Sequence, residues 1–310
     1  MSKKHLRNAA IACISAVLCT AALFEPVCAE DVVYYDSASE AASELRKAMK
    51  DRESEVTVGV IKDVDQEGLK KLIRSLLKKA VRHTGVPDEG DYINFQYSRY
   101  DASAKTEKVN GDMGVVVRYK LSYYDSAAQE EALDEKIGEV LESLDLDGKS
   151  DYEKVVAIHD WLCDNVEYDS ADGIDLRRTA YDAIVNGTAV CQGYSNAFYR
   201  MLLEAGVDNR IIFGEGVEDS GARMAHTWNI VDLYGDYYYV DVTWDDSTGS
   251  LDYFLKPAGE FTDSHIAGDE YAGDFFTKTY PVSGEEFTFD YGKPNAAVIS
   301  CAREMTEALS

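Results

Sequence analysis

The chain has 310 residues, and its 57 Asp and Glu residues outnumber its 31 Lys and Arg residues, which gives a formal net charge of −26. The hydrophobic content of 45% is enough for a buried core and argues against wholesale disorder. The charge argues against nucleic acid and anionic lipid as partners, because both bind a basic face. We therefore expect an acidic globular protein of one large or two modest domains, with neutral or basic partners.

Residues 1–29 have the pattern of a secretory signal peptide. Basic residues near the start precede an apolar run at positions 9–24, and Val27-Cys28-Ala29 places small residues at −3 and −1 of a cleavage site before Glu30. An apolar run of sixteen residues is short for a membrane anchor. We therefore expect a secreted or extracytoplasmic protein without stable membrane insertion after cleavage.

Cleavage would leave three cysteines, which are Cys163, Cys191 and Cys301. An odd number leaves at least one thiol free, and no pair has the Cys-x-x-Cys spacing of a zinc site. Whether Cys163 and Cys301 form a disulfide stays open. We expect neither a metal nor a cofactor.

Residues 30–125 are predicted to form a small N-terminal α+β region with no evident chemistry. Ser37 and Glu40 have the spacing of a capping box at the start of a helix. Periodicity predicts, in chain order, a helix, a strand, a helix and two β segments, over residues 37–51, 55–61, 69–77, 92–100 and 115–124.

Residues 126–270 are predicted to form a second region, and residues 271–310 a C-terminal extension. The second region opens with two helices that carry capping boxes, Ser126 with Gln129 and Ser150 with Glu153. The first of these helices is expected to run to about residue 144, and the second has apolar residues at helical spacing.

His159 and Cys163 lie four residues apart on the second of these helices and therefore share a face. The pair could be half of a metal site or a nucleophile with its base. No nearby residue completes a ligand set, so we expect core packing. Asp245-Asp246 could hold a cation, although a solvated turn is the favoured interpretation.

Cys191 is predicted to lie in the first turn of a buried helix. Asn186-Gly187 signals a turn before it, apolar residues then recur at helical spacing, and Gly206 is a stop signal. The unpaired amides at a helix start lower the pKa of a thiol and can donate to a developing oxyanion. A buried structural cysteine is the alternative.

Three β segments follow, at 211–214, 225–233 and 237–244. A four-residue hairpin loop between the last two would place Asp241 opposite Trp228, on the same face as His226 and one diagonal away. A carboxylate could then hold the imidazole while the imidazole faces Cys191. Nucleophile, base and orienting group would be complete.

These residues resemble the Cys, His and Asp blocks of the transglutaminase-like superfamily. The blocks are Gly187-x-x-x-Cys191-x-Gly193-Tyr194, His226-x-Trp228-Asn229 and Asp241-Val242-Thr243, and the similarity extends over about 150–265, including a downstream His265. The resemblance implies an α+β, papain-like fold in which a helix bearing the Cys packs on an antiparallel sheet bearing the His and Asp.

The resemblance also implies roles for three residues. Cys191 would be the nucleophile, His226 the general base and acid, and Asp241 the orienting carboxylate. Animal transglutaminases carry Trp after the nucleophile and bind calcium, whereas Gln192 follows Cys191 here and no calcium loop is convincing. Tyr181 and Gln192 are candidates for a side-chain donor to the oxyanion.

We expect a secreted thiol enzyme that acts on protein or peptide amides through a thioester, with hydrolysis by a peptidase or deamidase slightly favoured. The alternatives are glutamine cross-linking by acyl transfer, a non-catalytic peptide-binding module, and a surface scaffold whose functional part is residues 30–125. A basic polypeptide would suit the acidic chain as substrate.

Overall fold

The computed structural model describes residues 32–169, 177–218 and 220–289, and the predicted signal peptide lies outside these ranges. The described residues form two compact units, 32–131 and 132–289. The division falls in a helix that begins just after the predicted region boundary at 125/126. None of the described helices is long and apolar enough to cross a bilayer.

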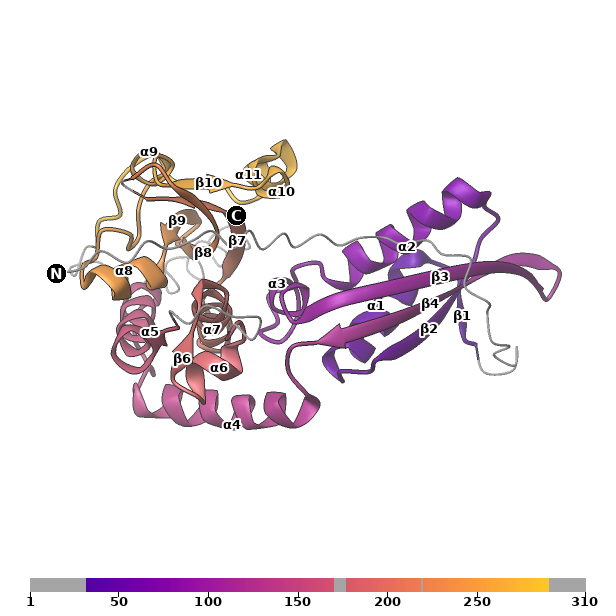
Figure 1. Ribbon diagram of the computed structural model, residues 1–310, viewed down its shortest axis with the longest axis horizontal. Coiled ribbons are helices and arrows are strands. Elements are labelled where there is room, and N and C mark those ends of the chain that lie inside the picture. Colours follow the sequence, from indigo (N-terminus) through magenta and orange to yellow (C-terminus); the bar gives the residue numbers. More distant parts are fainter. Residues whose placement is uncertain (1–31, 170–176, 219, 290–310) are drawn as a thin grey trace, which may run out of the picture. The chain divides into compact units, whose positions relative to one another are not determined.

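The first unit is a four-stranded sheet with two long helices (Figure 1). The strand order is β1-β2-β4-β3, with β1 parallel to β2 and the other pairs antiparallel. The elements in chain order are β1 (Tyr34–Tyr35), α1 (Ala38–Lys50), β2 (Glu55–Ile61), α2 (Gln66–Ala80), α3 (Asp91–Asn94), β3 (Tyr97–Val109) and β4 (Asp112–Tyr123).

Both long helices cover the same face of this sheet. Alternate residues of β2, namely Val56, Val58 and Val60, join one core cluster with apolar residues of α1 and α2. Since alternate strand residues point to one face, the two helices share that face. The predicted capping box of α1 is present, because Ser37 and Glu40 each accept from the other's backbone.

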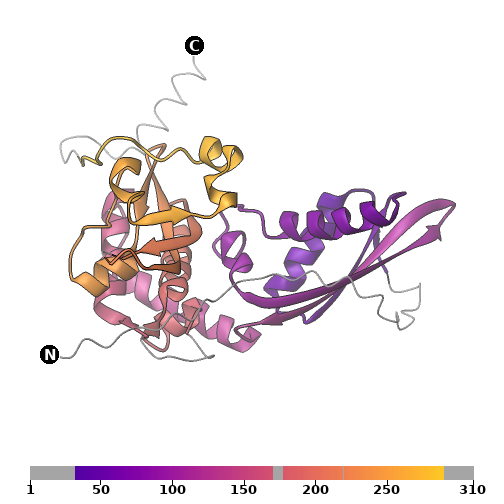
Figure 2. The same ribbon diagram turned by 45° about the horizontal axis from the view of Figure 1, so that its top comes forward.

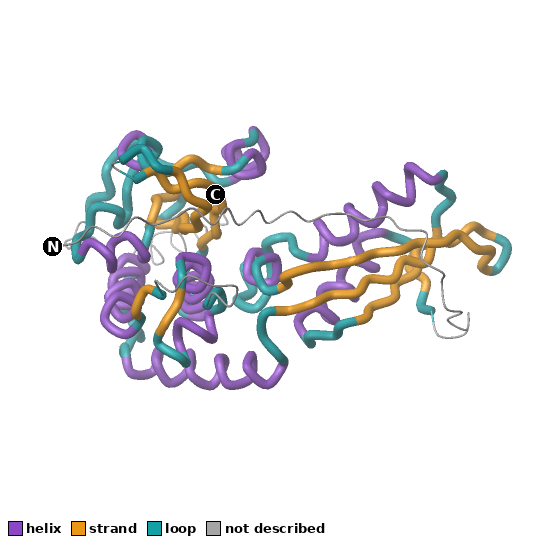
Figure 3. The backbone as a smooth tube through the Cα atoms, viewed as in Figure 1, coloured by secondary structure: helices purple, strands orange, loops and turns teal. Residues whose placement is uncertain are grey.

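The β3–β4 ribbon departs from the prediction at both ends. The β segment was predicted to begin at residue 92, but residues 91–94 form the short helix α3. The two β segments were predicted to end at residue 100 and to begin again at 115, but β3 and β4 continue to a tight turn in which Asn110 and Gly111 have φ of 51° and 102°. An Asn-Gly pair favours this type I′ geometry, so the strands extend to the turn (Figure 3).

The second unit packs helices on a four-stranded sheet of order β10-β7-β8-β9, beside a two-stranded pair β5-β6. Two helices start at the predicted caps, namely α4 (Ala127–Ser143) and α5 (Asp151–Asn165). Helix α4 begins in the first unit. The next elements are β5 (Glu167–Tyr168), α6 (Ala180–Ile184), β6 (Thr188–Ala189), α7 (Cys191–Glu204), β7 (Asn209–Val217), β8 (Arg223–Leu233) and β9 (Asp236–Val240). The chain continues through α8 (Val242–Thr248), α9 (Ala258–Phe261), β10 (His265–Ala267), α10 (Asp269–Ala272) and α11 (Asp274–Thr279).

Helix α7 packs against β7 and β8, and this contact sets the start of α7 beside the sheet (Figure 2). The β8–β9 hairpin has the predicted register, in which Leu233 pairs with Asp236 across the turn Tyr234-Gly235. The third β segment was predicted to reach residue 244, but β9 ends at Val240 and α8 follows. The predicted extension from residue 271 begins within α10, and residues 290–310 lie outside the described part.

Candidate active site

Cys191 is the first residue of α7 and is half-buried, with a free thiol. The turn before it uses Gly187, whose φ is 71°. Gly193 allows the first turn of α7 to pack closely, because a Cβ there would lie 2.6 Å from the Cβ of Ala189. The amide of Cys191 is therefore at a helix start, where backbone N–H groups have no intrahelical acceptor.

His226 lies in β8 and hydrogen-bonds the thiol of Cys191. Burial alone would raise the pKa of this thiol, but the charge of His226 and hydrogen bonds from His226 and Thr227 lower it. Burial alone would likewise lower the pKa of His226, but the charges of Asp241 and Cys191 raise it to about 10. Both directions favour a thiolate beside an imidazolium.

Asp241 holds the other side of this imidazole. Its Oδ2 lies 2.6 Å from Nε2 of His226, and both residues are buried. Nε2 is thus committed to the carboxylate, which leaves Nδ1 as the ring nitrogen available to the thiol. The structure brings together the three side chains that the sequence predicted.

The carboxylate of Asp241 accepts from four donors. Its Oδ1 accepts from the backbone N–H groups of Thr243 at 3.0 Å and Trp244 at 3.2 Å, because Asp241 is the N-cap of α8. Its Oδ2 accepts from His226 and also from Nε2 of His265 at 2.9 Å. Burial would raise the pKa of Asp241, but His226 and His265 hold it well below its usual range.

His265 was noted in the sequence only as a downstream residue of the family pattern. It lies at the start of β10, stacks on Phe261 with ring centroids 3.8 Å apart, and tilts against Trp244. Burial and the charge of His226 lower the pKa of His265, whereas its hydrogen bond to Asp241 and the charge of Asp241 raise it. The net direction is downward. A neutral His265 therefore donates from Nε2 and fixes the second oxygen of the carboxylate.

Trp244 also packs on the imidazole of His226. Its ring stacks on His226 with centroids 5.2 Å apart and planes 29° apart, and Trp228 stacks on the same ring at 5.9 Å. Gly216 of the neighbouring strand leaves room for this stack, since a Cβ there would lie 2.8 Å from Trp244. The imidazole is thus fixed by two rings and a carboxylate.

Tyr168, at the end of β5, was missed by sequence reasoning. Partial burial and then the charge of Cys191 raise the pKa of its phenol to about 12. Of the two side chains predicted as oxyanion donors, Gln192 is buried in α7 and Tyr181 is half-buried in α6. Their role stays a prediction.

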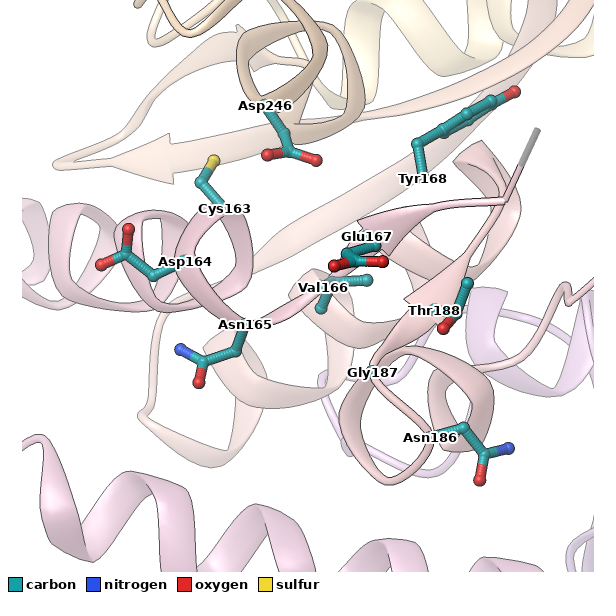
Figure 4. A pocket seen from close by; sticks show the side chains of 10 residues that line it. All are labelled: Cys163, Asp164, Asn165, Val166, Glu167, Tyr168, Asn186, Gly187, Thr188 and Asp246. Atoms are coloured by element: carbon teal, nitrogen blue, oxygen red, sulfur yellow. The ribbon is translucent and has the colours of Figure 1, made fainter.

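The pair His159 and Cys163 does have a third member, contrary to expectation. Nε2 of His159 lies 3.9 Å from Sγ of Cys163 and 3.2 Å from Oδ2 of Asp245. The expected solvated turn at Asp245-Asp246 is therefore wrong. Asp245 is buried in α8, and Asp246 accepts from the hydroxyl of Tyr194 at 2.6 Å. Figure 4 shows the sulfur of Cys163 directed toward the carboxylate of Asp246.

One group in the described part of the chain has the spacing of a metal site. One ligand atom from each of His226, Asp241 and His265 lies within 4.8 Å of the other two. Both imidazoles already donate to a single oxygen of Asp241, so a cation there would have to replace hydrogen-bonded protons. The prediction that the protein needs no metal stays a prediction.

Comparison with known proteins places this site in a family. Residues 139–242 match the model of the transglutaminase-like superfamily. Human Kyphoscoliosis peptidase is 33% identical over 157 residues, which cover 43% of this chain and 23% of that protein. Its mouse counterpart is 30% identical over 152 residues, with 42% and 23% covered. The match therefore spans less than a quarter of either curated relative.

A solved structure described as a TGase gives a TM-score of 0.32 at 14% identity, covering 68% of this chain and 59% of that one. A TM-score of this size does not show that the two proteins share a fold. The family assignment instead stands on the match over 139–242, together with a helix that begins at Cys191 and packs on an antiparallel sheet that carries His226. Residues 139–242 are thus a domain of the transglutaminase-like superfamily, within a mixed α+β fold.

Proposed function

We propose that this protein is an exported thiol hydrolase that cleaves amide bonds in proteins or peptides. The observation that carries the proposal is the connected series of thiol, imidazole and carboxylate formed by Cys191, His226 and Asp241 at the start of α7. The lowered pKa of the thiol and the raised pKa of the imidazole favour the thiolate and imidazolium pair that nucleophilic catalysis requires.

In the first step, the thiolate of Cys191 attacks the carbonyl carbon of the amide, and a carbon–sulfur bond forms. The carbonyl oxygen takes the negative charge, and the amide N–H of Cys191 is positioned to donate to it. His226 then gives its Nδ1 proton to the departing nitrogen, so the carbon–nitrogen bond breaks and a thioester remains.

In the second step, water replaces the departed amine. His226, now neutral, takes a proton from the water as its oxygen attacks the thioester carbon. The carbon–sulfur bond breaks, a carboxylic acid leaves, and the thiolate returns. Asp241 keeps the imidazole oriented with its Nε2 proton in place throughout both steps.

Hydrolysis is favoured over cross-linking because the matched relatives are described as peptidases. The net charge of −26 favours a basic polypeptide as substrate. Export rests on the signal-peptide pattern of residues 1–29. Deamidation and cross-linking use the same thioester and differ only in the bond attacked or in the acceptor.

The test is to incubate the protein with casein, with and without a fluorescent primary amine. New amino termini indicate a peptidase, ammonia release indicates a deamidase, and amine incorporation indicates a cross-linking enzyme. Each activity should be lost in Cys191→Ala. The proposal fails if none of the three activities appears and if, at about pH 6, Cys191 reacts with iodoacetamide no faster than a model thiol does. In that case the domain is a binding module.

A further inference from the structure

Strand β3 is the outer strand of the sheet in the first unit. It pairs with β4 on one side, and no described strand pairs with its other side. The strand is 13 residues long, and from Arg99 to Val109 it has no proline and no register shift in its pairing with β4. A long outer strand with neither a bulge nor a proline can pair with a strand of another chain.

The open side of β3 carries the backbone groups of its even-numbered residues. In β4, the N–H of Leu121 donates to Ser54. The C=O of Met113 accepts from Lys62. Both partners flank β2, so the odd-numbered residues of β4 face β2 and its even-numbered residues face β3. The residues of β3 opposite the latter are odd-numbered and face back toward β4. The open side therefore presents the N–H and C=O groups of the alternate residues, among them Ala102, Ala104 and Thr106.

The side chains of β3 alternate in the same way. Those of Ala102 and Ala104 pack against the core cluster that includes α1 and α2. The odd-numbered side chains lie on the other face of the sheet. From residue 99 to residue 107 their charges run plus, minus, neutral, plus, minus, and they belong to Arg99, Asp101, Ser103, Lys105 and Glu107.

This order of charges is complementary to itself in an antiparallel pair. Because the outward backbone groups must meet, even-numbered residues of one copy lie opposite even-numbered residues of the other. The register centred on Ser103, the midpoint of β3, places Arg99 opposite Glu107 of the second copy. It also places Asp101 opposite Lys105 of the second copy. A two-fold axis repeats each contact, so four pairs of opposite charge form.

The two neighbouring registers that satisfy the same backbone condition are opposed by charge. A shift of two residues in one direction places Arg99 opposite Lys105 of the second copy. A shift in the other direction places Asp101 opposite Glu107 of the second copy. Like charges directly opposite each other destabilise a pair of strands, so the sequence of β3 favours the register centred on Ser103.

The acidity of the chain does not oppose a contact through the first unit. Residues 32–131 contain 18 Asp and Glu against 16 Lys and Arg. Little of the net charge of −26 therefore lies in the unit that would meet a second copy.

We propose that β3 is a dimerisation edge, at which a second copy of this chain adds its own β3 in antiparallel register about Ser103. The two four-stranded sheets then form one continuous sheet of eight strands. Arg99 already pairs with Asp101 within one copy, and Lys105 with Glu107, so the second copy extends these ion pairs into a network. This interface is independent of the chemistry at Cys191.

Two charge reversals in the full chain test the register. Asp101→Lys places a Lys opposite Lys105 of the second copy, and Lys105→Glu places a Glu opposite Asp101 of the second copy. Each variant alone should therefore weaken self-association by at least about tenfold. A mixture of the two variants should form a heterodimer that recovers most of the affinity, because each reversed residue then lies opposite a residue of opposite charge. Sedimentation equilibrium gives the dissociation constants, and a different affinity tag on each variant identifies the heterodimer.

Lys62→Glu is the matched control. Lys62 is exposed and follows β2, which β4 separates from β3, so the same change of charge should leave self-association unchanged. Circular dichroism checks the fold of each variant, and recovery in the mixture shows in addition that both variants keep β3 in place.

Three results would overturn the proposal. The unchanged chain could be a monomer at about 100 μM protein, in which case β3 does not bind a second copy. Both reversals could leave the dimer as stable as that of the unchanged chain, in which case its interface lies elsewhere. The mixture could fail to recover the affinity, in which case Asp101 and Lys105 do not lie opposite each other.

Discussion

The second unit contains two clusters of the same three residue types, and they differ in where the sulfur lies on its helix. Cys191 is the first residue of α7, whereas Cys163 lies in the last turn of α5. The positive end of a helix stabilises a thiolate and offers free N–H groups, while the negative end does neither. Only the first cluster therefore combines an activated sulfur with a backbone donor for an oxyanion.

The two carboxylates differ as well. Asp241 accepts from four donors, whereas Asp245 accepts from His159 and from the backbone N–H of Tyr253. The contact of Asp241 with its imidazole is also shorter, at 2.6 Å against 3.2 Å. The comparison teaches that a Cys-His-Asp set is suited to catalysis by its surroundings and not by its composition.

The largest expected effect comes from removing each sulfur in turn. Cys191→Ala should lower the rate of amide cleavage by about 10⁵- to 10⁶-fold, as removal of a nucleophile does in other triads. Cys163→Ala should leave the rate near that of the unchanged chain. Release of new termini from casein measures both, and circular dichroism checks that the variants fold. Equal losses in the two variants would break the distinction between the clusters.

Replacing the carboxylates should give the next largest difference. Asp241→Asn should reduce cleavage by about 10³- to 10⁴-fold, because both oxygens of Asp241 accept hydrogen bonds, and the amide replaces one of them with a donor and removes the charge that stabilises the imidazolium of His226. Asp245→Asn should instead lower the free energy of unfolding by about 1–3 kcal/mol, since it weakens a buried hydrogen bond to His159. The cleavage rate and urea unfolding of both variants check this. A large loss of activity in Asp245→Asn would contradict the assignment.

Titration of the two imidazoles should change the free energy of unfolding in both clusters, by less than the carboxylate replacements change the measured properties. The pKa of His226 and of His159 is raised from 6.5 to about 10 in each case. A raised pKa means that the folded state binds the proton more tightly, so the stabilisation is complete below about pH 6.5 and is lost as the pH rises through about 10. The free energy of unfolding should therefore fall between these values.

Urea unfolding at a series of pH values measures this fall. His226→Gln and His159→Gln should each remove part of the dependence of the free energy of unfolding on pH. The cleavage rate should decline near pH 10, because His226 loses its proton there. A free energy of unfolding that rises over the same interval would show that neither imidazole is held in its charged form. If one variant removes this pH dependence entirely, the dependence comes from that variant's cluster alone.

Much of the first cluster could be predicted because it depends on local signals. Gly187 and Gly206, with φ of 71° and 82°, bracket the helix that Cys191 starts, and the register of the β8–β9 hairpin brings Asp241 to His226. These signals lie within a few residues of the elements that they define.

The second cluster could not be predicted in the same way. Asp245 looks solvated in the sequence, and it is buried only because α8 packs against α5 and α7. His265 reaches Asp241 because β10 pairs with β7, a contact between distant strands. The start of α8 was a missed local signal, since an Asp before a helix is a common cap.

His265 offers the smallest and most specific test, because no described residue of the second cluster is an equivalent second histidine on the carboxylate. His265→Leu removes one donor from Asp241 and should reduce the cleavage rate by about two- to tenfold, the value of one hydrogen bond. With less of its charge neutralised, Asp241 should hold the proton on His226 more tightly, so the alkaline limb of the pH–rate profile should move to higher pH.

His265→Gln is the matched control, since its amide N–H can replace the imidazole donor and should restore both the rate and the profile. A purely structural role for His265 would lower stability in His265→Leu without moving the alkaline limb. Recovery of the profile in His265→Gln would place His265 as a positioning residue that acts on His226 through Asp241. Among the described residues no second histidine donates to Asp245, so the contribution of His159 to the pH dependence of unfolding should not respond to either variant.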